Sequence, residues 1–179
     1  MVIAEQKLFS ETNDRHISAK QDAVEEYFAW MGRDGVEELQ RAATFLRGVP
    51  LLQDILDAMP VAVLVLNDKG QIVLMNRHWG RSTGDGTDCS LGKRYGELLG
   101  CIHTPEGSDG CGTSAHCADC GAFASILAGR QSQRQEIREY RLTHQTSYGT
   151  EVAELIVSST VIPAAGRNFI VFVVQDTRP

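Results

Sequence analysis

The hydrophobic pattern of this chain changes its period at Pro60, and that change sets the class of fold available to it. Before Pro60, apolar residues recur every three or four positions, which is typical of amphipathic helices. After it, a valine-rich run at 61–67, a turn at 68–70 and a second apolar run at 71–75 predict a β-hairpin. We therefore expect a mixed α/β (α+β) domain preceded by helices.

Three helices are expected before the hairpin. Ser18 and Asp34 each stand three residues before a glutamine or glutamate, which is the spacing of a capping box. A third, short helix covers 51–58 and ends before Pro60. The apolar stripes of these helices either pack on the domain that follows or form a dimer seam, since periodicity does not distinguish the two. We assign residues 1–50 to an N-terminal helical extension and possible dimerisation element.

The remaining elements follow in an order that points to one sheet. After the hairpin comes a polar stretch with short helical pieces and then one longer helix. Three strands complete the chain. Residues 91–99 include a short helical piece, the longer helix covers 122–128, and the strands are 135–143, 152–162 and 168–175.

The run from Leu51 to Asn76, LLQDILDAMPVAVLVLNDKGQIVLMN, resembles the opening of a PAS domain. The resemblance continues through 92–99 to the last strands, so residues 51–179 are assigned to a PAS-like sensor domain. It implies a five-stranded antiparallel sheet with helices on one side around a small cavity. It also implies a sensory or dimerising role without catalysis. PAS domains usually pass signals onward through a final Asp-x-Thr, and here Asp176 and Thr177 are adjacent.

Four of the five cysteines fall within a cysteine-rich loop at 101–120. They are Cys101, Cys111, Cys117 and Cys120. The last two form a C-x2-C pair, the short chelate that closes around a single metal. Neighbouring glycines allow backbone N–H groups to approach sulfur. His103 is the first alternative ligand; we expect His116 to be directed elsewhere by its neighbour Cys117.

Four thiolates suit a four-cysteine iron–sulfur cluster or tetrahedral zinc, and thiol or disulfide chemistry is a further alternative. Zinc sites commonly have two close pairs, whereas iron–sulfur sites tolerate irregular spacing. Some PAS sensors carry a four-cysteine cluster that oxygen destroys, so the resemblance favours iron–sulfur, as [4Fe-4S]. Cys89, outside the cluster, is expected to be a buried free thiol. The polar, glycine-rich segment 102–110 is expected to be ordered only when the centre is present.

Composition limits the possible partners. The net charge of −6 and the absence of a basic stripe argue against nucleic acid. No apolar run is long enough to span a bilayer, and no secretory signal begins the chain, so we expect a cytoplasmic protein without a membrane partner. No phosphate loop, Ser/His/Asp arrangement or cluster of carboxylates points to an enzyme.

These observations predict a cytoplasmic PAS-type sensor that detects redox state, oxygen or metal through its four-cysteine site. A homodimer is expected, with output through a signalling partner protein or an output domain missing from this chain. The alternative is a zinc-stapled PAS module that binds a small ligand in its cavity or mediates protein–protein dimerisation.

Overall fold

The computed structural model describes residues 32–79 and 87–177. The helix expected after Ser18 lies outside these residues. The helices are α2 (Val36–Arg47), α3 (Leu52–Ala58), α5 (Thr87–Ser90), α6 (Tyr95–Leu98), the 3₁₀ turns η1 (Thr104–Glu106) and η2 (Ala115–Asp119), and α7 (Gly121–Ser132). The strands are β1 (Ala62–Leu66), β2 (Ile72–Met75), β3 (Glu136–Thr146), β4 (Gly149–Ala164) and β5 (Arg167–Asp176).

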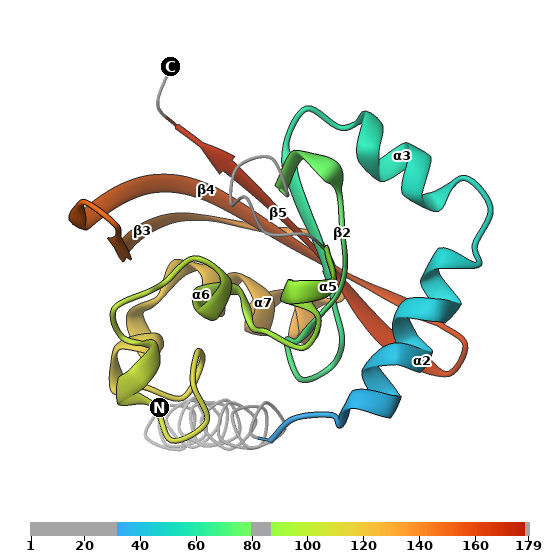
Figure 1. Ribbon diagram of the computed structural model, residues 1–179, viewed down its shortest axis with the longest axis horizontal. Coiled ribbons are helices and arrows are strands. Elements are labelled where there is room, and N and C mark those ends of the chain that lie inside the picture. The colour runs from blue at the N-terminus through green and yellow to red at the C-terminus, as the bar shows by residue number, and fades with distance from the viewer. Residues whose placement is uncertain (1–31, 80–86, 178–179) are drawn as a thin grey trace, which may run out of the picture. The chain divides into compact units, whose positions relative to one another are not determined.

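The five strands form one antiparallel sheet in the order β2-β1-β5-β4-β3, which confirms the predicted fold class (Figure 1). The hairpin of β1 and β2 lies at one edge, and β3 at the other. Strands β3 and β4 pair from Glu136↔Ser159 to Thr146↔Gly149, farther than the sequence predicted. The long segment between β2 and β3 therefore has to cross from one edge of the sheet to the other.

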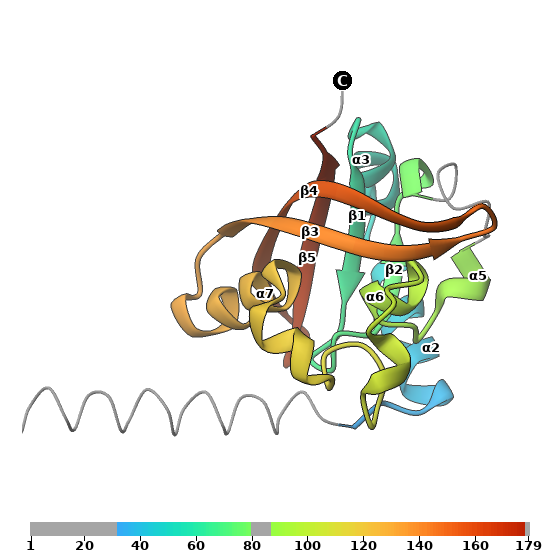
Figure 2. The same cartoon turned by 90° about the vertical axis from the view of Figure 1, so that its left-hand side faces the viewer.

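Strand β4 shows how the two faces of the sheet differ. Its odd-numbered residues from 153 to 161 are buried, and the residues between them are exposed or half-buried. The buried side, which we call the inner face, carries helix α7 (Figure 2). There the Ser159 hydroxyl donates to the carbonyl of Ser125 at 2.6 Å, and Ser159 Oγ would lie only 2.8 Å from a Cβ on Gly129. Small residues thus bring α7 close to the sheet.

Helix α2 covers part of the opposite, outer face. Its residues Leu39, Ala42 and Leu46 pack with side chains of β1, β2 and β5. The apolar stripe of this helix thus packs on the sheet. The predicted capping box at Asp34 is wrong: Gly35 is the N-cap, without a side-chain bond. Asp34 instead accepts a hydrogen bond from Asn67 Nδ2 at 3.1 Å, so its carboxylate links the start of α2 to the hairpin turn.

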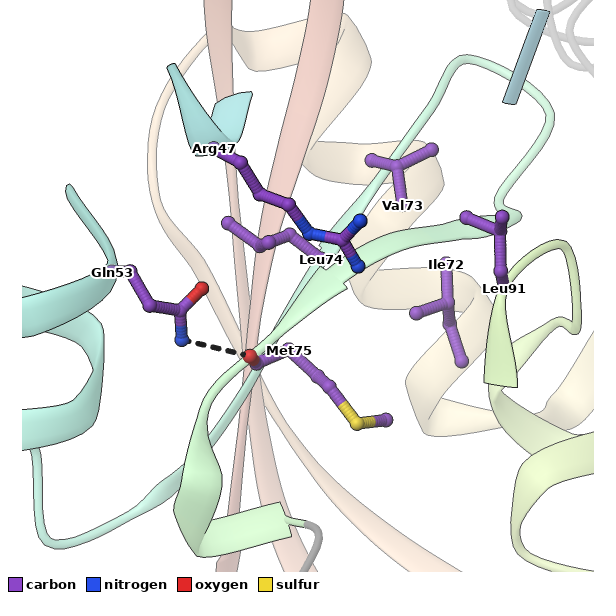
Figure 3. Close-up of a pocket in the computed structure, with 7 residues that line it drawn as sticks. All are labelled: Arg47, Gln53, Ile72, Val73, Leu74, Met75 and Leu91. Carbon is purple, nitrogen blue, oxygen red and sulfur yellow. Dashed lines mark hydrogen bonds between the residues drawn. The ribbon is translucent and has the colours of Figure 1, made fainter. Parts of the chain in front are cut away.

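A cavity of about 140 Å³ lies beside β2, between α2 and α3 (Figure 3). On its rim the Gln53 amide donates to the Met75 carbonyl at 3.2 Å. Its lining contains no cysteine, so this cavity is separate from the cysteine-rich loop. The lining residues are Arg47, Gln53, Ile72, Val73, Leu74, Met75 and Leu91.

Asn76, fully buried, fastens α3 to the hairpin. Its side-chain oxygen accepts from the backbone N–H of Val63 at 3.0 Å, and its amide donates to the carbonyls of Leu56 and Val61 at 3.0 and 2.8 Å. These bonds satisfy backbone groups at the start of β1 and the end of α3 that would otherwise be buried without partners.

Among residues 32–79 and 87–177, no helix is long and apolar enough to cross a membrane.

Candidate four-cysteine site

The cysteine-rich loop is tied to both edges of the sheet. An isolated antiparallel bridge joins Gln71, beside β2, to Arg94. A second bridge joins Cys101 to His144 in β3, where Ile102 N donates to the Thr143 carbonyl at 3.1 Å. Cys101 is therefore held against the edge strand by backbone hydrogen bonds and not by its side chain.

The other three cysteines reach the same region from different elements. Cys111 lies in the loop after η1, Cys117 lies in η2, and Cys120 is the N-cap of α7. All four are free thiols; Cys117 is buried and the others are half-buried.

Gly96, in α6, lies beside both Cys101 and Cys111. Its backbone N–H donates to Cys111 Sγ at 3.3 Å. A Cβ on Gly96 would lie 2.8 Å from Cys111 Sγ and 3.2 Å from Cys101 Cβ. The absence of a side chain at this position leaves the space that both cysteines occupy, and any larger residue would displace them.

Cys111 is influenced by the charge of the other three cysteines. Burial raises the pKa of Cys111 to about 12, the Gly96 N–H opposes the rise, and negative charge on Cys117, Cys120 and Cys101 adds to it. Such surroundings favour a cation beside the sulfur, because a bound metal replaces the thiol proton. The other three cysteines are therefore close enough to Cys111 for their charge to act on it.

Cys120 differs from Cys111 in its surroundings. Burial raises its pKa, and the backbone N–H groups of Ala122 and Phe123 oppose that rise. These groups belong to the first turn of α7, where unpaired N–H donors and the helix dipole stabilise negative charge. The N-terminus of α7 therefore offsets part of the rise in the pKa of Cys120.

An aromatic wall closes the site on the side of the sheet. The rings of Tyr95 and Tyr140 lie 5.8 Å apart, and Tyr95 packs edge-on against Phe172 at 4.9 Å. Burial raises the pKa of both tyrosines, and charge on Cys120 raises them further. The Tyr95 hydroxyl is buried and has no hydrogen-bond partner among the described residues. Such a wall limits the access of water from the side of the sheet, and the unpaired Tyr95 hydroxyl is a donor available to an acceptor near the thiols.

The donor set fits a thiolate-bound metal centre. Tetrahedral zinc with Zn–S bonds of about 2.3 Å brings four sulfurs to within about 3.8 Å of each other. A cluster of several iron ions and sulfides is also held by four thiolates and occupies a larger space.

A buried arginine holds the loop that carries Cys111. Arg94 is fully buried and donates to the carbonyls of Asp109 and Cys111, each at 2.9 Å, and to Asp109 Oδ2 at 3.1 Å. Arg33 forms ion pairs with Asp109 and with Glu97, whose carboxylate also accepts from Cys111 N at 3.3 Å. The charged side chains at 94, 97 and 109 connect Cys111 to Arg33, near the start of the described chain.

Cys89 lies in a different environment from the one predicted. It is a free thiol but is exposed, so its predicted burial is wrong. Helix α5 is a single turn, and Ser90, the residue after Cys89, is fully inaccessible to solvent.

His103, the alternative ligand, lies with its Nδ1 3.2 Å from the Glu106 carboxylate, and its ring stacks on His116 with 4.0 Å between centroids.

The order of strands and the helices inserted between β2 and β3 define a small domain with one antiparallel sheet. Residues 51–115 match the family model of the PAS domain. Over these residues the chain is therefore similar to the PAS domain family, whose members are sensor and signalling modules. No curated protein matches the chain at a significant level.

Solved PAS domains share this fold at low sequence identity. The PAS domain of nitrogen regulation protein NR(II) from Vibrio parahaemolyticus is similar with a TM-score of 0.52 and 13% identity, covering 72% of this chain and 99% of that one. The PAS domain of an HTR-like protein from Haloarcula marismortui has a TM-score of 0.49 and 15% identity, covering 76% and 97%. A PAS domain from a two-component sensor histidine kinase has a TM-score of 0.47 and 14% identity, covering 70% and 92%.

Proposed function

We propose that this PAS domain is a cytoplasmic sensor whose four cysteines hold an iron–sulfur cluster and report oxygen or redox state. The observation that carries the proposal is that three free thiols from separate elements act on the buried Tyr95 and Tyr140, and that Cys117 acts on two of these thiols. The three are Cys101, Cys111 and Cys120. In a reducing compartment such thiols bind metal more readily than they form stable disulfides. The irregular spacing of the four cysteines along the chain, with a single close pair, favours a cluster over zinc. We assign the domain a binding role and no catalytic one.

The chain's own residues supply the binding energy and the control of solvent access. Cys111, with a pKa of about 12, gives up its proton only when a cation replaces it, so loading of the site couples to proton release. The amide of Gly96 and the first turn of α7 donate hydrogen bonds to sulfur, which stabilise the thiolate forms. The aromatic wall keeps water away. When bound, an iron–sulfur cluster would supply an electron donor that oxygen can oxidise.

The ion pairs around Asp109 give this site a route to the rest of the chain. Loss of the centre would free Cys111, and Arg94 binds the carbonyl of Cys111 and the carboxylate of Asp109 together. Arg33 binds the same carboxylate at 3.2 Å. We propose that movement of the Cys111 loop is transmitted through Asp109 to Arg33, and so to the preceding part of the chain.

Output through a homodimer and a partner protein is part of the same proposal. Four apolar side chains lie exposed on the outer face of β3 and β4, which α2 does not cover. A dimer would bury them and remove apolar surface from water. They are Ile137, Val152, Ile156 and Ile162. At the end of β5, the Thr177 hydroxyl donates to the carbonyl of Glu154 at 2.8 Å, which anchors the predicted output position to β4.

Anaerobic purification tests the proposed function. We expect a brown protein whose iron and acid-labile sulfide are lost in air, and a Cys117→Ser variant that binds none. Cys89→Ser is the matched control, because Cys89 is exposed and outside the cluster, and it should keep the full metal content. A colourless protein with zinc that is lost in the Cys117→Ser variant would support the stapled module instead. Protein without metal would refute the site.

A further inference from the structure

A second group of ligand side chains lies on the surface of the cysteine-rich loop. His103, Glu106 and His116 have ligand atoms that all lie within 4.8 Å of one another. The Glu106 carboxylate is 3.2 Å from His103 Nδ1 and 3.6 Å from His116 Nε2. The two rings stack at 4.0 Å with planes inclined by 22°. One carboxylate thus faces two imidazoles at once.

The backbone holds these three residues in place through two short turns. His103 precedes η1, and Glu106 is its last residue; the turn includes Pro105. His116 lies in η2, whose N-cap is Ser114. The Ser114 side chain is 4% exposed; its hydroxyl accepts from His116 N at 3.2 Å and donates to Glu106 Oε2 at 3.1 Å. A buried serine therefore orients the carboxylate and positions one of the histidines.

We propose that His103, Glu106 and His116 form a binding site for a divalent transition-metal ion such as Zn²⁺, separate from the four thiols. Two imidazoles and one carboxylate are a ligand set that zinc uses in proteins, with water completing the tetrahedron. Imidazole ligands disfavour Mg²⁺ and Ca²⁺, which take oxygen donors.

The structure requires only small movements to form this site. Zinc–ligand bonds of about 2.0–2.1 Å in a tetrahedron place ligand atoms about 3.3–3.4 Å apart. The largest separation in the group is below 4.8 Å, so side-chain rotation can close the gap. The side chains of His103, Glu106 and His116 are 31%, 48% and 61% exposed, and rotation meets little packing.

The site would join the two turns that precede thiol ligands. His103 is two residues after Cys101, and His116 directly precedes Cys117. An ion bound between them would cross-link η1 to η2 on the solvent side, while the cysteines meet below. This inference does not depend on what the thiols bind, because no cysteine contributes a ligand.

The test compares variants that all keep the four cysteines. Zinc bound per chain is measured by equilibrium dialysis and metal analysis on anaerobically purified protein, for wild type and for His103→Ala, His116→Ala and Glu106→Gln. His78→Ala is the control, because His78 is also exposed and belongs to neither site. Since any zinc taken by the thiols is common to all five proteins, differences between them report the second site.

We expect wild type and His78→Ala to bind one zinc more per chain than the two histidine variants. Glu106→Gln should bind that zinc at least about tenfold more weakly, since it removes the anionic ligand. In nuclear magnetic resonance spectra, the ring signals of His103 and His116 should shift on zinc addition. Equal zinc content in all five proteins would overturn the proposal. So would a histidine variant that also loses the iron of the thiol centre, because the two sites would then be one.

Discussion

Replacement of Gly96 by alanine tests the geometry of the thiol site without removing a ligand. The added Cβ would meet Cys111 Sγ at 2.8 Å and Cys101 Cβ at 3.2 Å, whereas ordinary van der Waals contact begins at 3.4 Å. Both cysteines have to move, and they have to move away from the same point. We expect Gly96→Ala to fold but to bind its metal centre at least about tenfold more weakly, comparable to loss of a supporting residue.

The effect on stability is smaller because two contributions oppose each other. Alanine favours a helix over glycine by up to about 1 kcal/mol, although α6 has only four residues and gains less. Overpacking a buried position costs about 1–3 kcal/mol. In the metal-free protein we therefore expect a net loss of about 0–3 kcal/mol in the free energy of unfolding. The metal-bound protein should lose more, since both ligands are held against the new methyl group.

Two measurements and one control complete this test. Metal content and absorbance after anaerobic purification report the site, and urea unfolding reports stability with and without chelator. Gly48→Ala is the matched control, because its Cβ would meet the nearest atoms at 3.4 Å and its backbone has φ −77°. If Gly96→Ala keeps the metal content and spectrum of the wild type, Cys101 and Cys111 do not meet over this glycine.

Three further outcomes follow from the structure. In metal-free, reduced protein at pH 8, Cys111 should react with iodoacetamide at least about tenfold more slowly than the exposed Cys89, because a thiol of pKa about 12 is almost wholly protonated. The reaction rate of Cys111 should rise with pH. Equal rates for the two cysteines in peptide mapping would contradict the burial of Cys111. Arg94→Met should lower the free energy of unfolding by about 3–5 kcal/mol, since it leaves a carboxylate and several carbonyls without their cation. The control variant Arg41→Met, at the surface, should change the free energy of unfolding by less than about 1 kcal/mol. Asn76→Ala should cost about 3 kcal/mol in urea unfolding, because three buried backbone groups lose their partner; a loss below about 1 kcal/mol would show that water replaces it.

The order of elements could be predicted because the period of apolar residues reports which face of an element is buried. The ends of the strands could not be predicted from the sequence. Residues at the ends of β3 and β4, such as Thr146 and Gly149, pair through their backbones and carry no apolar signal. The same limit applies to α7, which continues past Gly129 to Ser132 because glycine here serves close packing on Ser159 and does not end the helix.

The cysteines could be selected from sequence because their chemistry is unusual, whereas their supporting residues could not. A lone arginine is normally at the surface, yet Arg94 is fully buried among four carbonyl oxygens that come from three separate parts of the chain. Similarly, His103 and His116 are thirteen positions apart, and only the folding of the two turns brings them to one carboxylate.

The bridge between Cys101 and β3 has a consequence for the association of copies of this chain. Strand β3 is the last strand of the sheet, and unpaired backbone groups along such a strand can recruit a strand from another molecule. Here residues 100–102 occupy part of that edge: Gln145 N donates to the Gly100 carbonyl at 2.9 Å, and Ile102 N donates to the Thr143 carbonyl at 3.1 Å. A metal centre that holds Cys101 in place would also keep residues 100–102 on the edge of β3. Release of the cysteine would then expose hydrogen-bonding groups of β3, and the chemical state of the sulfurs would determine whether the edge of the sheet can accept a strand from a neighbour.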